Sequence, residues 1–136
     1  MRNPLEELVG FQLVRTAAFG LRTLNLAYGD LNLRHPDAAV LLVIEANPGI
    51  TQSSVGRMLN IQRSNMVPIM GRLSERGWVE RRPGKGKSIS LHLSEAGAEV
   101  MPRIRAASQT AETALAGPIS ADEFSALHST LRQIGR

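Results

Sequence analysis

The chain of 136 residues contains no cysteine, a single tryptophan and a single tyrosine. The lack of cysteine excludes disulfide bonds, thiolate-bound zinc or iron–sulfur clusters, and a switch based on thiol oxidation. The three histidines, His35, His92 and His128, are far apart in the sequence, and there is no H-E-x-x-H motif. The sequence therefore predicts neither a metal site nor a cofactor.

Long hydrophobic runs are also missing from the chain. None approaches the roughly 18 residues that a membrane-spanning helix requires, and residues 1–7 resemble neither a signal peptide nor a transit peptide. The length agrees with a single domain, for which about 100–200 residues are usual. We therefore expect one domain, residues 1–136, in a soluble, cytoplasmic protein that makes no contact with a membrane.

One stretch suggests an enzyme, because Gly86-Lys87-Ser88 matches the end of the phosphate-binding motif G-x-x-x-x-G-K-[ST]. The position that requires the first glycine of this motif is occupied by Arg81. Apolar and polar residues alternate from Ile89 to Leu93, which predicts a strand where the motif would begin a helix. Since the sequence also lacks a nucleophile–base pair and metal-ligand spacing, it does not favour an enzyme.

The net charge of +4 is unevenly distributed along the chain. Residues 51–90 carry eight Lys and Arg against two Glu, whereas the segments before and after them are both slightly acidic. A basic block between two near-neutral arms is typical of a nucleic-acid-binding segment, although a solvated basic surface is the alternative. The pattern of residues within the block has to decide between the two.

The N-terminal arm, residues 1–34, is predicted to consist mainly of one long helix. Asn3 and Pro4 favour a helix start, with Asn3 as the cap and Pro4 in the first turn. Apolar residues recur at helical spacing from Leu5 to Tyr28, and further apolar residues widen this stripe beyond one face. A helix with more apolar surface than one neighbour can cover indicates packing in a dimer.

The C-terminal arm, residues 95–136, is predicted to be helical as well. Ser94 can cap a long helix, in which we expect a bend at Pro102. Ser120 begins a capping box for a last helix that has one apolar face. We expect the two arms together to form a dimerisation region.

Between the arms, residues 36–94 have the pattern of a DNA-binding lobe. Thr51 is a plausible N-cap for a short helix, and a basic helix follows from Arg63 to Arg76 after a tight turn. Residues 51–76 therefore have the organisation of a helix-turn-helix. In its first helix we expect Val55, Met58 and Leu59 to face inward, and the apolar residues of its second helix are Met66, Val67, Ile69, Met70 and Leu73.

Pro68 is unusual within the basic helix, because it lacks an N–H and conflicts with the carbonyl group of Ser64. We expect the helix to kink at this point; the alternative is a helix whose regular part starts late. After the helix, two short strands flank a glycine-rich, cationic turn, which predicts a β-hairpin wing over residues 78–93. Trp78 is better explained as a core residue than as one that stacks on a base.

The stretch ITQSSVGRMLNIQRSNMVPIMGRLSERGWVERRPGKGKSISLHLSEAG resembles the core of the MarR family of bacterial winged helix-turn-helix regulators. The Thr-Gln opening, R-S-N-M, RLSERGWVERR and LHLSEAG occur in the order of the family. The resemblance implies a mostly α-helical fold with a small β-hairpin wing, in an intertwined homodimer held together by the N- and C-terminal helices. The chain departs from the family at the wing, where Pro83-Gly84-Lys85-Gly86-Lys87 replaces a longer tip with Asp-x-Arg.

The resemblance implies a sequence-specific, ligand-responsive repressor that binds double-stranded DNA at a pseudo-palindromic operator. Side chains at the start of the basic helix would reach base edges, while hydroxyls and other cations would contact phosphates or the minor groove. Arg72 can alternatively pair with Glu75 on the same helix. The predicted DNA-binding residues are Thr51, Ser53, Ser54, Gln62, Arg63, Ser64, Asn65, Pro68, Arg72, Arg81, Arg82, Lys85 and Lys87.

In the family, small phenolic or aromatic effectors lie between the dimerisation helices and the DNA-binding lobe. The candidates for such a site are Arg15, Arg22, Tyr28, Arg34 and His35, most of which are equally well explained as helix-surface or cap residues. The alternative function is a protein-interaction module that kept the winged-helix fold and lost specific DNA binding. The basic block and the polar start of its second helix argue against this alternative.

Overall fold

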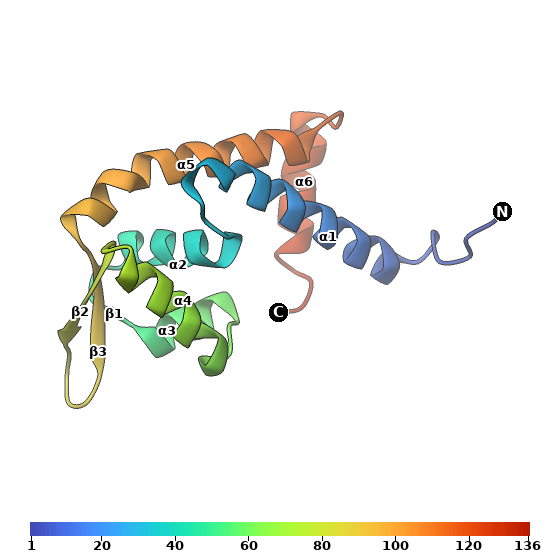
Figure 1. Ribbon diagram of the computed structural model, residues 1–136. Coiled ribbons are helices and arrows are strands. Elements are labelled where there is room, and N and C mark those ends of the chain that lie inside the picture. The colour runs from blue at the N-terminus through green and yellow to red at the C-terminus, as the bar shows by residue number, and fades with distance from the viewer.

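The computed structural model describes residues 1–136 and is mostly helical, with one small antiparallel sheet (Figure 1). None of the helices combines the length and the apolar character needed to cross a membrane. The elements are α1 (Val9–Ala27), the 3₁₀ helix η1 (Gly29–Leu31), α2 (His35–Ala46), β1 (Ile50–Thr51), α3 (Gln52–Leu59), α4 (Arg63–Glu75), β2 (Val79–Pro83), β3 (Ile89–Leu93), α5 (Glu95–Ala116) and α6 (Ala121–Leu131).

The arm helices and the lobe form two layers that meet at α2. α1 lies along α5, and its N-terminal half projects away from the rest of the molecule (Figure 1). α2 packs against α5 on one side and against α3 and α4 on the other. Because η1 connects α1 to α2, the short segment around it is the covalent link between the N-terminal arm and the lobe.

The wing contains the predicted hairpin and one additional strand. β2 and β3 pair in antiparallel register from Val79 opposite Leu93 to Pro83 opposite Ile89. β1 pairs with the other edge of β3, so that the strand order is β1-β3-β2. The proline in β2 is tolerated because β2 is an edge strand, in which one side of the backbone has no partner.

The hydrophobic core lies in the lobe. Leu41 of α2, Met70 of α4 and Leu91 of β3 are fully buried, and α5 adds Met101 and Ile104 from above. In contrast, α1 and α6 contain no buried residue at all. The lobe therefore shares its core with α5, whereas α1 and α6 present much of their apolar surface to solvent.

The predicted helix caps in the lobe and the C-terminal arm are confirmed. The hydroxyls of Thr51, Ser94 and Ser120 each accept a hydrogen bond from the backbone N–H three residues further on, at 3.2, 3.0 and 3.1 Å. Each bond satisfies one N–H group that has no partner within its helix.

The predicted start of the first helix is wrong. α1 begins at Val9, and the Asn3 side chain only closes a turn, in which its Oδ1 accepts a hydrogen bond from the N–H of Leu5 at 3.0 Å. Asn3 and Pro4 therefore initiate local structure, but the chain does not continue from it into the helix.

Two expectations about the helix-turn-helix also need correction. Met58 was expected to face inward but is 59% exposed. A late start of the basic helix is excluded, because α4 begins at Arg63 and continues through Pro68 to Glu75. The kink at Pro68 remains a prediction.

Candidate nucleic-acid interface

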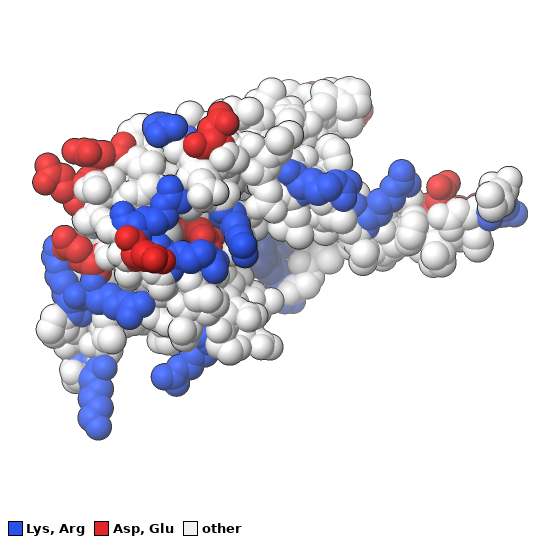
Figure 2. Space-filling model, viewed as in Figure 1, with Lys and Arg blue, Asp and Glu red and all other residues white.

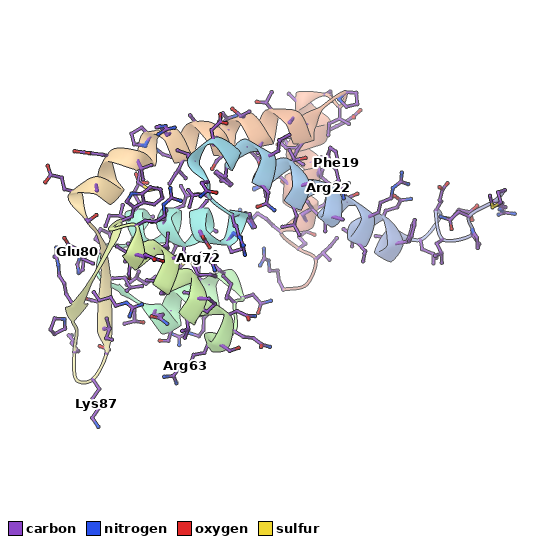
Figure 3. All side chains as sticks on the ribbon, in the orientation of Figure 1. Phe19, Arg22, Arg63, Arg72, Glu80 and Lys87 are labelled. Atoms are coloured by element: carbon purple, nitrogen blue, oxygen red, sulfur yellow. The ribbon has the colours of Figure 1, made fainter.

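The start of α4 and the tip of the wing lie at the same end of the lobe. Arg63 and Lys87 both extend from this end into solvent, away from the arm helices (Figure 3). In Figure 2, Lys and Arg side chains project from the lower end of the lobe, and the acidic side chains of this face lie mostly above them. The side chains of Arg63, Arg81, Lys85 and Lys87 form no hydrogen bond or ion pair within the chain, so their charges are available to a ligand.

The two arginines of β2 lie on opposite faces of the hairpin, because neighbouring side chains in a strand alternate. Arg81 is opposite Leu91 in the sheet, and Arg82 is opposite Ser90. Arg82 also pairs with Glu80, at 2.9 Å between Nη2 and Oε2. Arg81 and Arg82 are therefore not equivalent, and only Arg81 is free of an acidic partner.

Arg72 binds an acidic side chain inside the lobe and does not pair with Glu75, the predicted alternative. Its Nε and Nη2 donate to the two carboxylate oxygens of Asp37 at 3.0 and 2.7 Å, and Asp37 is only 4% exposed. These hydrogen bonds raise the pKa of Arg72, although burial opposes the effect. The pair joins α2 to α4, and it makes Arg72 a poor candidate for a phosphate contact.

Arg76 holds the C-terminal end of α4 against the link between the arm and the lobe. Its guanidinium group donates to the carbonyl oxygens of Leu31 and Asn32 at 2.7 and 2.9 Å. It also lies 3.8 Å from the centre of the Trp78 ring, in a cation–π contact. Trp78 is half-buried and packs against the core, as predicted.

The predicted polar contacts fall into two groups. Thr51 and Ser54 use their hydroxyls within the protein, since Thr51 donates to Ser54 at 2.9 Å and Ser54 accepts from Arg57 at 3.0 Å. The residues of the second group are exposed on the outer surface of the lobe: Ser53, Gln62, Arg63, Ser64, Asn65 and Pro68.

A cavity of about 510 Å³ lies between the end of α1, η1 and α5. Its polar lining includes Thr23, Asp30, Arg103 and Thr110, and small apolar side chains of α5 cover much of the rest. No pattern in the sequence indicates this cavity, because alanines along a helix indicate only helical structure. All of its lining residues belong to the two arms, so it lies between the arm helices and not between these helices and the lobe, where the family resemblance placed an effector.

None of the five predicted ligand-binding residues lines this cavity. Arg15 and Arg22 line a separate shallow groove along α1, with Phe19 between them (Figure 3). Tyr28 is buried, and its hydroxyl forms a hydrogen bond with Ser108. Arg34 is exposed, and His35 is half-buried, which lowers the pKa of its imidazole. The five residues do not converge on one site.

Comparison with known proteins shows similarity to transcriptional regulators. The transcriptional repressor CouR, in a structure bound to a 23-mer DNA duplex, is 26% identical to this chain and superposes with a TM-score of 0.91 over the full length of both chains. A model of the MarR family matches residues 30–87, which cover most of the lobe and reach the wing tip. This segment is similar to the MarR family, and the whole chain has the fold of a MarR-type repressor.

Other relatives show the same similarity to transcriptional regulators. CouR bound to p-coumaroyl-CoA is 28% identical, with a TM-score of 0.90 over all of this chain and 97% of that one. The putative transcriptional regulatory protein for the hcr operon of Thauera aromatica is 27% identical over 99 residues, which cover 71% of this chain and 60% of that protein. The predicted resemblance to the MarR family and the winged helix-turn-helix fold are both confirmed.

Proposed function

We propose that this protein is a sequence-specific DNA-binding repressor of the MarR type that acts as a homodimer in the cytoplasm and is released by a small ligand. The observation that carries this proposal is the position of Arg63 and Lys87, whose unpaired cations project from the recognition helix and the wing at one end of the lobe. No arrangement of residues suggests catalysis, and the relatives are regulators, so we do not propose an enzyme.

In the proposed complex, the start of α4 enters the major groove. Gln62, Arg63, Ser64 and Asn65 would reach base edges there, since side chains at the N-terminal end of a recognition helix lie nearest to the bases. Lys85, Lys87 and Arg81 would contact phosphates or the minor groove. Thr51, Ser53 and Ser54 would lie near the phosphates, while Arg72 and Arg82 would act through their ion pairs within the protein.

We assign residues 1–34 and 95–136 to dimerisation and residues 36–94 to the DNA-binding lobe. The support is the exposed apolar surface of the arms, where Val9, Val14 and Leu26 are more than two-thirds exposed. Surface of this extent is typical of a protein–protein interface. A two-fold dimer would place two recognition helices about 10 base pairs apart on a pseudo-palindromic site.

For the ligand, we propose a small aromatic or phenolic group in the cavity between α1, η1 and α5. The similar repressor CouR has been observed with p-coumaroyl-CoA, which carries such a group. The two lobes of a dimer can have a spacing that fits DNA or one that does not. A ligand that binds the second state more tightly would lower the affinity for the operator by the ratio of its affinities for the two states.

The test is fluorescence anisotropy with a duplex selected by the protein from a random pool, against a scrambled duplex, over a series of salt concentrations. We expect tighter binding to the selected duplex and a log K that falls by about 0.9 per phosphate neutralised for each tenfold rise in salt. The variant Lys87→Ala should reduce this slope, whereas Glu99→Ala on α5, far from the wing, should not. Weak, equal binding to both duplexes would instead support the interaction module that lost specific DNA binding.

A further inference from the structure

The outward side of the recognition helix carries no charge over most of its length. α4 buries Met66, Ile69, Met70 and Leu73. At 100° per residue, the opposite side consists of Ser64, Val67, Pro68 and Gly71, all of which are exposed. Glu75 ends this stripe one turn later, and its carboxylate would repel DNA phosphates.

Two residues of this stripe have no structural reason to be in a helix. Proline and glycine are the least favourable residue types for a helix interior. A Cβ atom added at Gly71 would meet nothing within 4 Å, and the backbone of this residue does not have a positive φ. Pro68 is exposed and fills no part of the core. Residues that disfavour the helix they lie in and do not stabilise the fold are expected at functional surfaces.

Val67 gives the same stripe an exposed apolar group. It is 60% exposed, although the other apolar side chains of α4 are buried. In the major groove, the apolar group that a protein can read is the C5-methyl of thymine, which apolar side chains contact directly. A surface without long side chains also lets the helix backbone approach the base edges closely.

We propose that Val67 and Pro68 recognise thymine methyl groups in the major groove, and that Gly71 permits the close approach this contact requires. The inference rests on the proposed DNA-binding function and adds the bases that the centre of the helix reads. Arg63 and Asn65 would form hydrogen bonds with base edges at the start of the helix. Val67 and Pro68, one turn later, would add apolar contacts with the bases.

The first experiment uses the duplex selected from a random pool, with each thymine of one half-site replaced in turn by deoxyuridine. This change removes only the methyl group. We expect one or two replacements to weaken binding by about fourfold each, the effect of exposing one buried methyl group. If every replacement leaves the affinity unchanged, the thymine readout is wrong while the repressor function stands. If the pool yields no enriched sequence, both are overturned.

The second experiment assigns the methyl contact to its residue. Val67→Ala should bind the thymine duplex more weakly, and it should lose the sensitivity to deoxyuridine that the unchanged protein shows. Ser129→Ala, at an exposed position of α6, should keep that sensitivity. A loss of affinity by Val67→Ala that is equal on both duplexes would show that Val67 does not contact the methyl group.

Gly71→Ala tests the close approach separately. Alanine should raise the melting temperature, because it favours the helix and meets no neighbour, while it should weaken binding to the selected duplex. These opposite directions distinguish a DNA contact from a structural role. Ser129→Ala, at an exposed position of α6, is the matched control, because it also favours the helix and should leave DNA binding unchanged. Unchanged binding by Gly71→Ala would overturn the close approach.

Discussion

The lobe and the arms follow the same amphipathic pattern but use it differently. In α2 and α4 the apolar stripe is buried, and Leu41 and Met70 are inaccessible to solvent. In α1 and α6 the stripe is as regular, yet Leu26 is 84% exposed and Leu127 is 42% exposed. The periodicity of a helix therefore shows which face needs a partner, but not whether that partner lies in the same chain. The lobe finds its partners within the chain, and for the exposed stripes of α1 and α6 the partner that we propose is a second copy.

The largest effect is expected when charged residues are introduced into the exposed apolar surface of the arms. Leu127→Asp combined with Leu131→Asp should convert the dimer into a monomer, because each copy would bury two carboxylates without a partner. Binding to the selected operator should fall by about 10²-fold or more, since the two lobes would no longer be linked. Sedimentation and anisotropy would measure both effects. Ser129→Asp, on another side of α6, is the control, and an unchanged oligomeric state in the double variant would contradict the assignment of the arms.

The second prediction concerns the core of the lobe. Leu41→Ala should lower the free energy of unfolding by about 2–5 kcal/mol, the usual cost of removing a fully buried leucine side chain. Val14→Ala on the exposed side of α1 should cost much less at a concentration where the protein is monomeric. Urea unfolding would compare the two, and equal losses would show that the arms pack within one chain as tightly as the lobe does.

The third prediction compares two ion pairs, one buried and one exposed. Asp37→Ala should cost about 1–3 kcal/mol of unfolding free energy, below the value for a fully buried pair because Arg72 stays partly in contact with water. Glu80→Ala, which breaks the exposed pair with Arg82, should cost about 0–1 kcal/mol. A loss for Asp37→Ala no larger than for Glu80→Ala would mean that the α2–α4 contact contributes little.

The smallest effect concerns pH and the link between the arm and the lobe. Burial lowers the pKa of His35 from its ordinary value of 6.5, so the folded protein takes up its proton at lower pH than the unfolded chain does. The free energy of unfolding should therefore decrease as the pH falls from about 6.5 through the folded pKa, and His35→Gln should remove this part of the decrease. Urea unfolding at about pH 7.5 and about pH 5 would test it. His128→Gln, at an exposed position, should behave like the unchanged protein.

The elements that could be predicted from the sequence are those determined by local interactions. The caps at Thr51, Ser94 and Ser120 depend on a hydroxyl and an N–H three residues away, and the wing depends on alternation and a glycine-rich turn. β1 could not be predicted, because two residues are too few to show the alternation of apolar and polar side chains that indicates a strand. Only their pairing with β3 makes them one. The start of α1 was predicted too early because Asn3 and Pro4 suit a turn as well as a helix.

The site could be predicted only in part, for a similar reason. Clustered charge along the chain pointed to the basic helix and the wing. Whether a cation is free depends on distant residues, and the sequence does not show that Asp37 binds Arg72 across 35 positions. The cavity could not be predicted, because the small residues of α5 that line it have no distinctive chemistry.

The anchors at the end of α4 divide this helix into two parts with separate roles. Arg72 and Arg76 attach its last turns to α2 and η1, whereas the exposed positions before them form no side-chain hydrogen bond within the protein. Substitutions between Arg63 and Gly71 on the outer surface can therefore change which bases are read at little cost to folding. The outer surface of α4 can therefore vary while the attachment of the helix to the lobe stays the same. Proteins that descend from one gene could acquire new operators by few mutations at these positions. The same positions are those to randomise when new specificities are engineered.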